Sequence, residues 1–380
     1  MIISRTTETY SNDIYVFYPF SSQFGGIERL IVDLSTWLSN RNKKLTWVGF
    51  QNDVSFRDLE TKGLDIVRLE APRNFASEKQ ALRSWYQSVN TNPSRILVLE
   101  LIGAKYAGSA LPNGYNLQIS DPPCLLPQDI TKFSFSLRRK YPNPAKRPSL
   151  ITAIRSELVF RRTILGIHKA TSAITMTHRN AKELESSFNR PFTVIPQGAR
   201  VPDKPISRKE NVYPRFLSVC RIEETKRIDA ILKAFARLNS PVARLTIVGN
   251  GSKLNELQLL SQNLGLKGRV TFTGEVSEIE LENIYAEHDI FLMPAVQGYG
   301  LPALEALVRG LSLIVHRDSG VCEYLIDIPQ VKIIDDVHDS LENAMKMLAK
   351  NRGSQSIPKI PTADQWSEEL AKTCDWPLLE

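Results

Sequence analysis

A glycine-bearing loop runs into a helix between residues 294 and 306, where the sequence is Pro-Ala-Val-Gln-Gly-Tyr-Gly-Leu-Pro-Ala-Leu-Glu-Ala. Pro302 suits the first helical turn, because its missing N–H would have no partner there in any case. The backbone N–H groups from Gly298 to Leu301 would then point at the space before the helix, a geometry that binds phosphate. A plain strand-to-helix turn shows the same glycine spacing, so this loop alone leaves both interpretations open.

Two cations follow an apolar run earlier in the chain. Arg221 and Lys226 lie in Ser-Val-Cys-Arg-Ile-Glu-Glu-Thr-Lys, directly after a predicted strand. Open α/β sheets bind ligands at the carboxyl ends of their strands. Arg can grip phosphate oxygens in pairs, and Lys supplies a compact charge. A solvated charged turn is the alternative for this pair taken alone.

The elements that would carry these residues alternate between β-rich runs and helical patterns, which is typical of a parallel sheet with helices on both faces. Apolar residues recur at helical spacing over 27–39, so a helix is expected there. Residues 198–213 are polar and proline-bearing and read as a linker. The strands expected before the linker span 14–20, 45–50, 65–69, 96–101, 115–119, 173–176 and 193–195.

The same alternation restarts after the linker. We expect helices at 227–238, 252–264 and 278–287, and a loop with a helix over 295–309. The expected strands span 215–220, 244–248, 270–273, 290–293 and 313–316.

With 380 residues the chain exceeds what one hydrophobic core usually organises. The fold class predicted is therefore α/β, with two Rossmann-like domains that face each other across a cleft. We place the first domain at residues 1–203 and the second at 204–360. Residues 361–380 are expected to form a helical tail that packs back on the first domain.

Several motifs in a fixed order make residues 216–325 resemble the C-terminal domain of family 4 glycosyltransferases, which have the GT-B fold. They are Leu-Thr-Ile-Val-Gly-Asn-Gly-Ser at 245–252, Leu-Gly-Leu-Lys-Gly-Arg-Val-Thr-Phe-Thr-Gly at 264–274, Ile-Tyr-Ala-Glu-His-Asp-Ile-Phe-Leu-Met-Pro at 284–294 and Gly-Tyr-Gly-Leu-Pro-Ala-Leu-Glu-Ala at 298–306. Phe-Gly-Gly-Ile-Glu-Arg at 24–29 and Thr-Val-Ile-Pro-Gln-Gly at 193–198 also fit, while residues 51–190 fit loosely.

The resemblance implies a retaining transfer of a sugar from a nucleoside-diphosphate sugar, bound by the second domain, to a hydroxyl of a glycan, lipid-linked or small-molecule acceptor, bound by the first. It implies no metal and no other cofactor. Arg221 and Lys226 would hold the diphosphate, and Glu305 would accept hydrogen bonds from the ribose. Gly25 and Gly26 would let the first loop approach the donor phosphate closely. The remaining donor-binding residues would be Gly249, Asn250, Gly251, Val276, Gly298, Tyr299, Gly300 and Leu301.

Two positions depart from the family pattern. Gln297 replaces the first glutamate of the Glu-x7-Glu motif, so the residue implied to lie near the transferred sugar is a neutral amide. Ser120 stands where the family often has a histidine, which leaves Asp121 as our candidate for contact with the acceptor hydroxyl. A helix cap or turn residue is the alternative for Asp121.

These departures keep a second function open, a nucleotide-sugar-binding partner subunit with reduced catalysis. A third, a Rossmann oxidoreductase, is disfavoured because residues 21–26 read Ser-Ser-Gln-Phe-Gly-Gly and lack the dinucleotide fingerprint.

Composition indicates an ordinary globular protein, with 42% hydrophobic and 23% charged residues. The apolar runs are strand-sized and too short to cross a bilayer. A polar start without the pattern of a secretory signal predicts a cytoplasmic location. The four cysteines are widely spaced, which indicates neither a disulfide framework nor a structural zinc site.

A net charge of +7 and a pI near 9.1 favour anionic partners. Residues 138–162 hold eight Lys or Arg against one acid, Glu157. From Leu150 onward, Ile151, Ile154 and Leu158 recur at helical spacing. The segment could make peripheral contact with an anionic membrane at its inner face, or bring a lipid-linked acceptor to the site. A core helix with a solvated basic face is the alternative. Nucleic acid is not expected, since no binding motif accompanies the charge.

Overall fold

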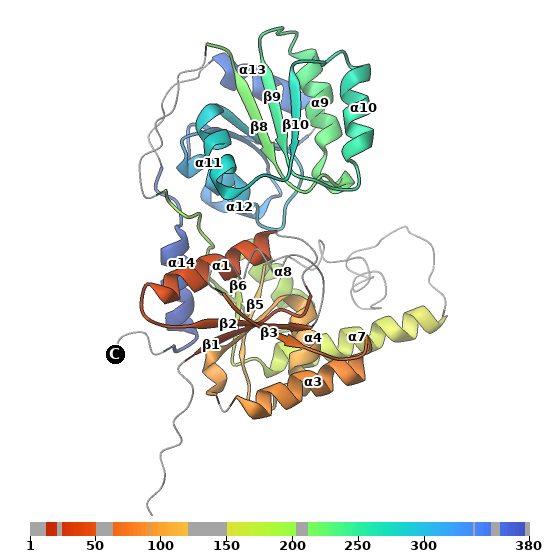
Figure 1. The fold of residues 1–380 in the computed structure, drawn as a ribbon, viewed down its shortest axis with the longest axis vertical. Coiled ribbons are helices and arrows are strands. Elements are labelled where there is room, and N and C mark those ends of the chain that lie inside the picture. Colours follow the sequence, from red (N-terminus) through yellow and green to blue (C-terminus); the bar gives the residue numbers. More distant parts are fainter. Residues whose placement is uncertain are drawn as a thin grey trace, which may run out of the picture. The chain divides into compact units, whose positions relative to one another are not determined.

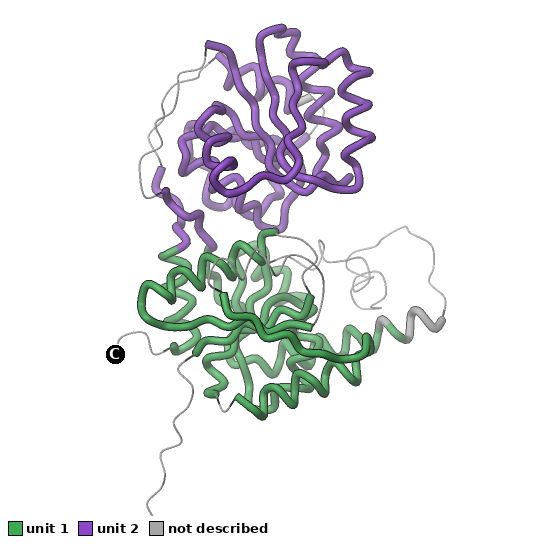
Figure 2. The backbone as a smooth tube through the Cα atoms, in the orientation of Figure 1, with its two compact units in different colours: residues 1–196, 364–380 green, residues 197–363 purple. Residues whose placement is uncertain are grey.

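The computed structural model describes residues 13–20, 25–50, 64–89, 91–120, 150–202, 212–336, 339–350 and 358–376. It divides into two compact units, shown in green and purple in Figure 2. Unit 1 comprises residues 1–196 and 364–380, and unit 2 comprises residues 197–363. The sequence placed these boundaries after residues 203 and 360.

The described part of unit 1 contains a seven-stranded sheet in the order β3-β2-β1-β4-β5-β6-β7, with every pairing parallel. The inner strands are buried on both faces, which is why their sequences are continuous apolar runs such as Ile-Leu-Val-Leu in β4. The strands are β1 (Ile14–Phe17), β2 (Leu45–Phe50), β3 (Asp65–Leu69), β4 (Ile96–Leu99), β5 (Asn116–Ile119), β6 (Ser172–Thr175) and β7 (Thr193–Val194).

Helices cover both faces of this sheet. Figure 1 shows α1 on one face and α3, α4 and α7 on the other. The helices described in unit 1 are α1 (Gly26–Ser39), α3 (Phe75–Ser88), α4 (Glu100–Ala110), α7 (Leu150–Lys169), α8 (His178–Phe188) and α14 (Ala363–Thr373), with a short 3-10 turn at Pro93–Arg95.

The α4–α7 contact is unusually close. A Cβ atom added to Gly166 of α7 would lie 1.9 Å from the carbonyl oxygen of Ala104, and one added to Gly108 of α4 would lie 2.5 Å from the nitrogen of Gly166. Glycine is therefore required for the two backbones to touch. Tyr115 fixes the same point, because its hydroxyl donates a 2.6 Å hydrogen bond to the carbonyl of Gly166.

Several strand boundaries predicted from the sequence are wrong by one to three residues, and the largest difference is in the strand expected over 14–20, which ends at Phe17. The strand expected over 96–101 ends at Leu99, and α4 begins at Glu100. Glu100 has a φ of +63°, the left-handed region that non-glycine residues seldom adopt. This change of backbone direction ends the strand although the apolar sequence continues through Leu101 and Ile102.

The described part of unit 2 contains a six-stranded parallel sheet in the order β10-β9-β8-β11-β12-β13. Its strands are β8 (Arg215–Val219), β9 (Arg244–Val248), β10 (Val270–Gly274), β11 (Ile290–Met293), β12 (Ser312–His316) and β13 (Val331–Ile334). Its helices are α9 (Ile228–Arg237), α10 (Leu254–Asn263), α11 (Glu278–Glu287), α12 (Leu301–Val308) and α13 (Asp339–Lys350), with 3-10 turns at Glu224–Lys226 and Gly320–Tyr324.

The core of unit 2 forms where α9 and α13 pack on the sheet. Ile231 and Phe235 of α9 are fully buried, and the Phe235 ring lies edge-on to Phe216 of β8 with 5.9 Å between the centroids. Burial of each such side chain contributes about 1.5–3 kcal/mol. Leu341 and Met345 of α13 belong to the same cluster.

The chain passes between the two units twice, and near these crossings two segments of unit 2 run together. Ala199 and Thr362 form a parallel β-bridge, and the N–H of Ala363 donates to the carbonyl of Ala199 at 3.1 Å. A Cβ added to Gly198 would lie 2.2 Å from the carbonyl carbon of Thr362, so glycine permits the approach. After the second crossing, the indole N–H of Trp376 donates to the carbonyl of Ser94 in unit 1 at 2.7 Å.

Within the described ranges, every helix is too short or too polar to span a lipid bilayer.

Candidate functional site

The residues singled out in the second half of the sequence lie at one edge of the unit 2 sheet. Arg221 and Lys226 follow β8, residues 249–251 follow β9, Val276 follows β10, and residues 297–301 follow β11. Because all six strands are parallel, these loops share the carboxyl edge. β9 and β11 lie on opposite sides of β8, so the loops after β8 and β11 meet at a topological switch point, where open α/β sheets bind ligands.

A hydrogen bond joins the two loops at this switch point. Lys226 Nζ donates to Gln297 Oε1 at 2.5 Å. Backbone contacts hold Gln297 in turn, because its N–H donates to Ser319 Oγ at 3.1 Å and its carbonyl accepts from the N–H of Gly320 at 3.3 Å. Its side-chain amide also donates to the carbonyl of Ala295 at 3.3 Å. Gln297 is thus fixed from both sides, and it orients the lysine without neutralising it.

Arg221 presents the second cation at this edge. The residue is exposed, and its guanidinium makes no hydrogen bond or ion pair with any residue that the structure describes. A guanidinium in this state can reorient toward a ligand and bind two phosphate oxygens at once.

The loop after β9 packs against the loop that carries Arg221. The N–H of Ile222 donates to the carbonyl of Asn250 at 2.8 Å, and the N–H of Lys253 donates to the carbonyl of Ile222 at 3.0 Å. A Cβ at Gly249 would lie 2.0 Å from the Cys220 oxygen, and one at Gly251 would lie 2.4 Å from the Ile222 oxygen. These contacts are a structural reason for both glycines, beside their predicted role in donor binding.

Glu223 reinforces the same junction. Its carboxylate accepts hydrogen bonds from the N–H and the hydroxyl of Ser252 at 3.1 and 2.5 Å. The hydrogen bonds from Ser252 lower the pKa of Glu223. The carboxylate therefore stays charged and holds the two loops together.

The glycine-bearing loop leads directly into α12, with Pro302 in the first helical turn, as the sequence predicts. Gly300 has φ +109° and ψ +41°, and a Cβ there would lie 2.7 Å from the Met293 methyl group. Leu301 and Pro302 open the helix, whose first-turn N–H groups have no partner within the helix itself. The dipole and these N–H groups make the start of α12 a suitable place for an anion.

Tyr299 anchors the loop with its side chain. Its hydroxyl donates to the carbonyl of Gln197, and its ring lies 6.5 Å from that of Tyr324. Burial raises the pKa of Tyr299 well above its ordinary value, so the phenol stays protonated. The side chain is therefore built into unit 2, and the backbone of Tyr299 is the part suited to ligand binding.

Glu305 lies one turn into α12, where neighbouring side chains fix it. Tyr285 donates from its hydroxyl to Glu305 Oε2 at 3.5 Å, and Arg309 Nη1 donates to the Glu305 carbonyl at 2.8 Å. Arg309 also makes a two-pronged contact with Glu282, and its guanidinium lies 4.9 Å from the centre of the Tyr285 ring. Burial is the largest single influence on Arg309 and opposes its charge, but the hydrogen bond and the charge of Glu282, together with the nearby Tyr285 and Glu305, outweigh it and raise the pKa of Arg309.

Gly25 and Gly26 lie in unit 1, at the start of α1. Glu28 caps this helix, since its Oε2 accepts from the N–H of Gly25 at 2.9 Å. A Cβ at Gly25 would lie 3.2 Å from that oxygen, whereas a Cβ at Gly26 would meet nothing within 4 Å in the described structure. Packing therefore gives no reason for glycine at position 26. Asp121 lies outside the described residues.

Glu100 is a candidate that the sequence analysis does not single out. It follows β4, between the ends of β1 and β5, and its Oε1 accepts from the N–H of Ser120 at 2.9 Å. Asn180 donates to the Ser120 carbonyl at 2.7 Å, and the buried Ser120 hydroxyl has no hydrogen-bond partner among the described residues. A left-handed glutamate at a strand end is the kind of strained residue that clusters at functional sites. The one sequence signal for it is a carboxylate that directly follows an apolar strand.

Residues 202–369 match the sequence model of the glycosyl transferases group 1 family. This part of the chain is a glycosyl transferase group 1 domain. The match covers all the site residues of unit 2 described above and confirms the resemblance found over residues 216–325.

Two relatives of this group 1 domain carry glycosyltransferase names. An uncharacterised glycosyltransferase of Bacillus subtilis is 24% identical over 210 residues, which is 52% of this chain and 58% of the relative. The alpha-monoglucosyldiacylglycerol synthase of Streptococcus pneumoniae is 35% identical over 104 residues, 27% of this chain and 24% of the synthase. The matches therefore span about a quarter to three fifths of these curated relatives.

Solved glycosyltransferase structures have the same fold over almost the whole chain, including unit 1 and the group 1 domain. The Anabaena protein HepE, in complex with UDP and glucose, superposes with a TM-score of 0.69 at 15% identity, over 96% of this chain and 99% of HepE. This likeness and the two parallel sheets confirm the GT-B fold predicted from the sequence.

Proposed function

We propose that this protein is a retaining glycosyltransferase that moves a sugar, a hexose or a related one, from a nucleoside-diphosphate sugar to an acceptor hydroxyl. The observation that carries the proposal is the convergence of Arg221, Lys226 and the start of α12 at the switch point of unit 2. Three sources of positive potential at one sheet edge suit a diphosphate better than any neutral ligand.

In this proposal the diphosphate binds between the two cations and the N–H groups at the start of α12. Negative charge grows on the leaving phosphate as the glycosidic bond breaks. Groups that are already oriented toward that charge lower the barrier without further reorganisation. Lys226, which Gln297 already holds in place, and Arg221, which would turn toward the bound donor, supply two positive charges there. We therefore propose that transfer requires no metal ion and no other cofactor.

The remaining contacts follow from the arrangement of the loops. Glu305, held by Tyr285 and Arg309, would accept hydrogen bonds from the ribose hydroxyls. The backbone of residues 249–251 and of Val276 would border the base, because those loops lie beyond the β8 loop along the same sheet edge. Gln297 would contact the transferred sugar.

Unit 1 would supply the acceptor side. We propose that Asp121 contacts the acceptor hydroxyl, and that Gly25 and Gly26 let the loop after β1 approach the donor phosphate. The acceptor proton would pass to the leaving phosphate as the sugar is transferred on the same face. Among glycan, lipid-linked and small-molecule acceptors, a lipid is supported by the relative whose name describes a glucosyldiacylglycerol synthase.

The experiment that tests this function is a panel of nucleotide sugars incubated with the purified chain, with and without EDTA. Proton NMR of the sugar products would follow the anomeric signal. We expect donor hydrolysis or transfer with retained anomeric configuration, unchanged by EDTA. Binding of NAD without any turnover of nucleotide sugars would overturn the proposal.

A second candidate function is a partner subunit that binds nucleotide sugars with reduced catalysis. The observation that favours it is the neutral Gln297 in contact with Lys226, where the family places a glutamate. Saturable binding of a nucleotide sugar, without hydrolysis or transfer, would support this candidate over the first.

A further inference from the structure

Helix α7 has one face that packs on unit 1 and one face that points outward. Phe160, Thr163 and Ile167 are buried, and Gly166 touches α4. On the other side, Leu158 and Leu165 are 46% and 43% exposed. Residues seven apart lie on the same side of a helix, so the two leucines form one exposed apolar stripe.

Cations flank this stripe on both sides. At about 100° per residue, Arg161 lies about 50° to one side of the leucines, while Lys169, Arg162 and Arg155 lie about 30° to 70° to the other. Arg155, Arg161 and Lys169 are exposed, and Arg162 is half-buried over the ring of Phe75 at 3.7 Å. We call Arg155, Leu158, Arg161, Arg162, Leu165 and Lys169 the α7 face.

The α7 face carries almost no compensating negative charge of its own. Glu157 is the one acid between residues 150 and 169, and it lies at the border of the face, where it pairs with Arg161 at 3.2 Å. The neighbouring helix α3 also has a single acid, Glu78, which is buried and accepts a 2.7 Å hydrogen bond from the Tyr106 hydroxyl. The described side chains of the α7 face therefore carry a net positive charge.

We propose that the α7 face docks on an anionic lipid bilayer. An apolar centre with basic flanks is the arrangement of a helix that lies in the plane of a lipid interface, where leucines reach the acyl boundary and cations meet the phosphate headgroups. A nucleic acid would match the cations but not the leucine stripe. The proposal rests on burial and charge alone, independently of the proposed enzyme activity.

The geometry of α7 suits this role. Its inner side is locked to α4 through Gly166 and to Tyr115, so the outer side is presented by a rigid support. Figure 1 shows α7 at the periphery of unit 1 beside α4. Arg155, Leu158, Arg161, Leu165 and Lys169 are exposed there. If the proposed transfer activity is correct, docking would bring unit 1 to lipid-borne acceptors.

Sedimentation of the full chain with vesicles tests the proposal. Phosphatidylcholine vesicles serve as the neutral surface, and an equal mixture with phosphatidylglycerol as the anionic one. We expect binding to the anionic vesicles only, and weaker binding as salt is raised, because the headgroup contacts are screened. The double variant Leu158→Ser/Leu165→Ser should lower the partition coefficient about tenfold or more, since two leucines lose their place in the apolar layer.

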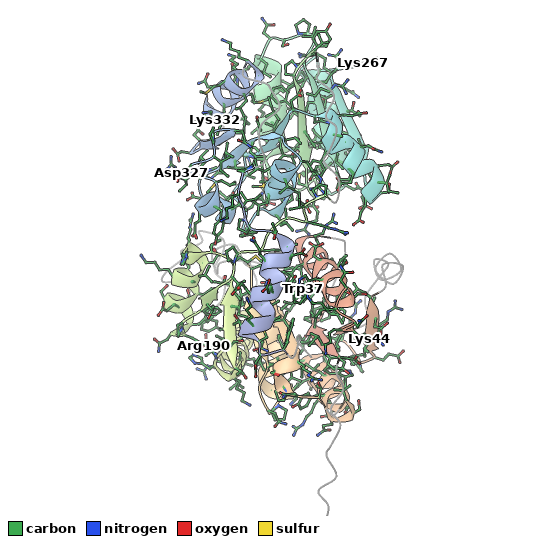
Figure 3. All side chains as sticks on the ribbon, turned by 90° about the vertical axis from the view of Figure 1, so that its left-hand side faces the viewer. Trp37, Lys44, Arg190, Lys267, Asp327 and Lys332 are labelled. Carbon is green, nitrogen blue, oxygen red and sulfur yellow. The ribbon has the colours of Figure 1, made fainter. Side chains whose placement is uncertain are left out.

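A matched pair of charge variants separates this surface from general basicity. The variant Arg155→Ala/Arg161→Ala should bind anionic vesicles more weakly. The control variant Arg244→Ala/Lys267→Ala removes the same amount of charge from exposed sites of unit 2 and should bind as the wild type does. Lys267 is labelled in Figure 3. Circular dichroism and the melting temperature check that each variant is folded. Equal binding of the wild type and the double serine variant would overturn the proposal, as would absence of binding to anionic vesicles. A change of oligomeric state in the serine variant, with vesicle binding retained, would assign the face to a second copy instead.

Discussion

Lys226 and Gln297 are joined by a 2.5 Å hydrogen bond between loops that are separated by 71 positions in the sequence. The amide accepts from the ammonium group without cancelling its charge, whereas a carboxylate at position 297 would form an ion pair with it. Gln297 therefore adds no negative charge beside Lys226 that would compete with an incoming phosphate. At the same time the direction of Lys226 is fixed by a residue implied to contact the transferred sugar.

Loss of either cation at the switch point should weaken binding of a nucleoside diphosphate. Arg221→Ala and Lys226→Ala each remove a charged donor, which costs about 1.5–3 kcal/mol of binding free energy. Calorimetry with UDP and GDP measures this. Lys267→Ala, an exposed lysine before β10 at the opposite edge of the sheet, is the control and should bind as the wild type does. Unchanged affinity in both site variants would exclude the diphosphate site.

Gln297→Ala should slow transfer more than it weakens nucleotide binding. The residue contacts the sugar in our proposal, so its loss acts on the transition state and lowers kcat. We expect a decrease of roughly tenfold or more, equivalent to about 1.4 kcal/mol per decade. A wild-type transfer rate in this variant would remove Gln297 from the site. If the wild type has negligible transfer activity and Gln297→Glu gains it, the partner-subunit function is favoured.

Tyr285→Phe should raise the KM for the donor and leave kcat nearly unchanged. The variant deletes the hydroxyl that donates to Glu305 Oε2 but keeps the ring beside Arg309. A 3.5 Å hydrogen bond is long, and it acts on the donor only through Glu305, so we expect roughly a 2- to 10-fold change in affinity. Steady-state kinetics with varied donor measures it, and Tyr213→Phe, at an exposed tyrosine before β8, is the control. If KM does not change, Glu305 does not depend on Tyr285 for its position.

Gly26→Ala should leave the stability of the fold unchanged and reduce transfer. A methyl group at this position meets nothing within 4 Å of unit 1, so no clash is expected in the folded chain without donor. If the loop after β1 approaches the donor phosphate closely, the methyl group would occupy that space. Melting curves and initial rates should therefore give different outcomes. Wild-type rates would show that the donor does not come near Gly26.

Gly166→Ala should destabilise unit 1 by about 1–3 kcal/mol, the usual cost of forcing extra volume into a packed contact. The added methyl group would overlap the backbone of Ala104, which cannot move without shifting α4. Urea denaturation followed by circular dichroism measures the free energy of unfolding. Stability equal to that of the wild type would mean that the α4–α7 contact is looser than the structure shows.

Much of the architecture could be predicted because local signals agree with it. β2, β3, β9 and β11 have the predicted boundaries, since each is rich in apolar or β-branched residues and is followed by a polar or turn residue. α11 also has its predicted bounds, and the capping box of Ser277 and Glu280 explains its start. No element is predicted for residues 331–350, although Leu341, Met345 and Leu348 of α13 recur at helical spacing.

The details of the site depend more on tertiary contacts. No local pattern places Glu100 at positive φ, because Ser120, which donates to its carboxylate, lies 20 residues away. Gly249 and Gly251 suggested ligand approach, and the structure adds close contact with the Cys220 and Ile222 carbonyls as a reason for them. Residues 138–149 of the basic segment lie outside the described residues. On α7, the burial of Phe160, Thr163 and Ile167 agrees with the interpretation as a core helix with a solvated basic face, and membrane contact stays a proposal.

The double crossing of the chain between its units has a consequence for biosynthesis. Residues 197–363 form unit 2, while unit 1 needs residues 364–376, including Trp376 with its hydrogen bond to Ser94, to be complete. During translation, every residue of unit 2 leaves the ribosome before the last helix of unit 1 does. Domains that fold as they emerge normally do so from the N-terminus onward. Here unit 2 can complete its fold first, while unit 1 stays incomplete until residues 364–376 have emerged.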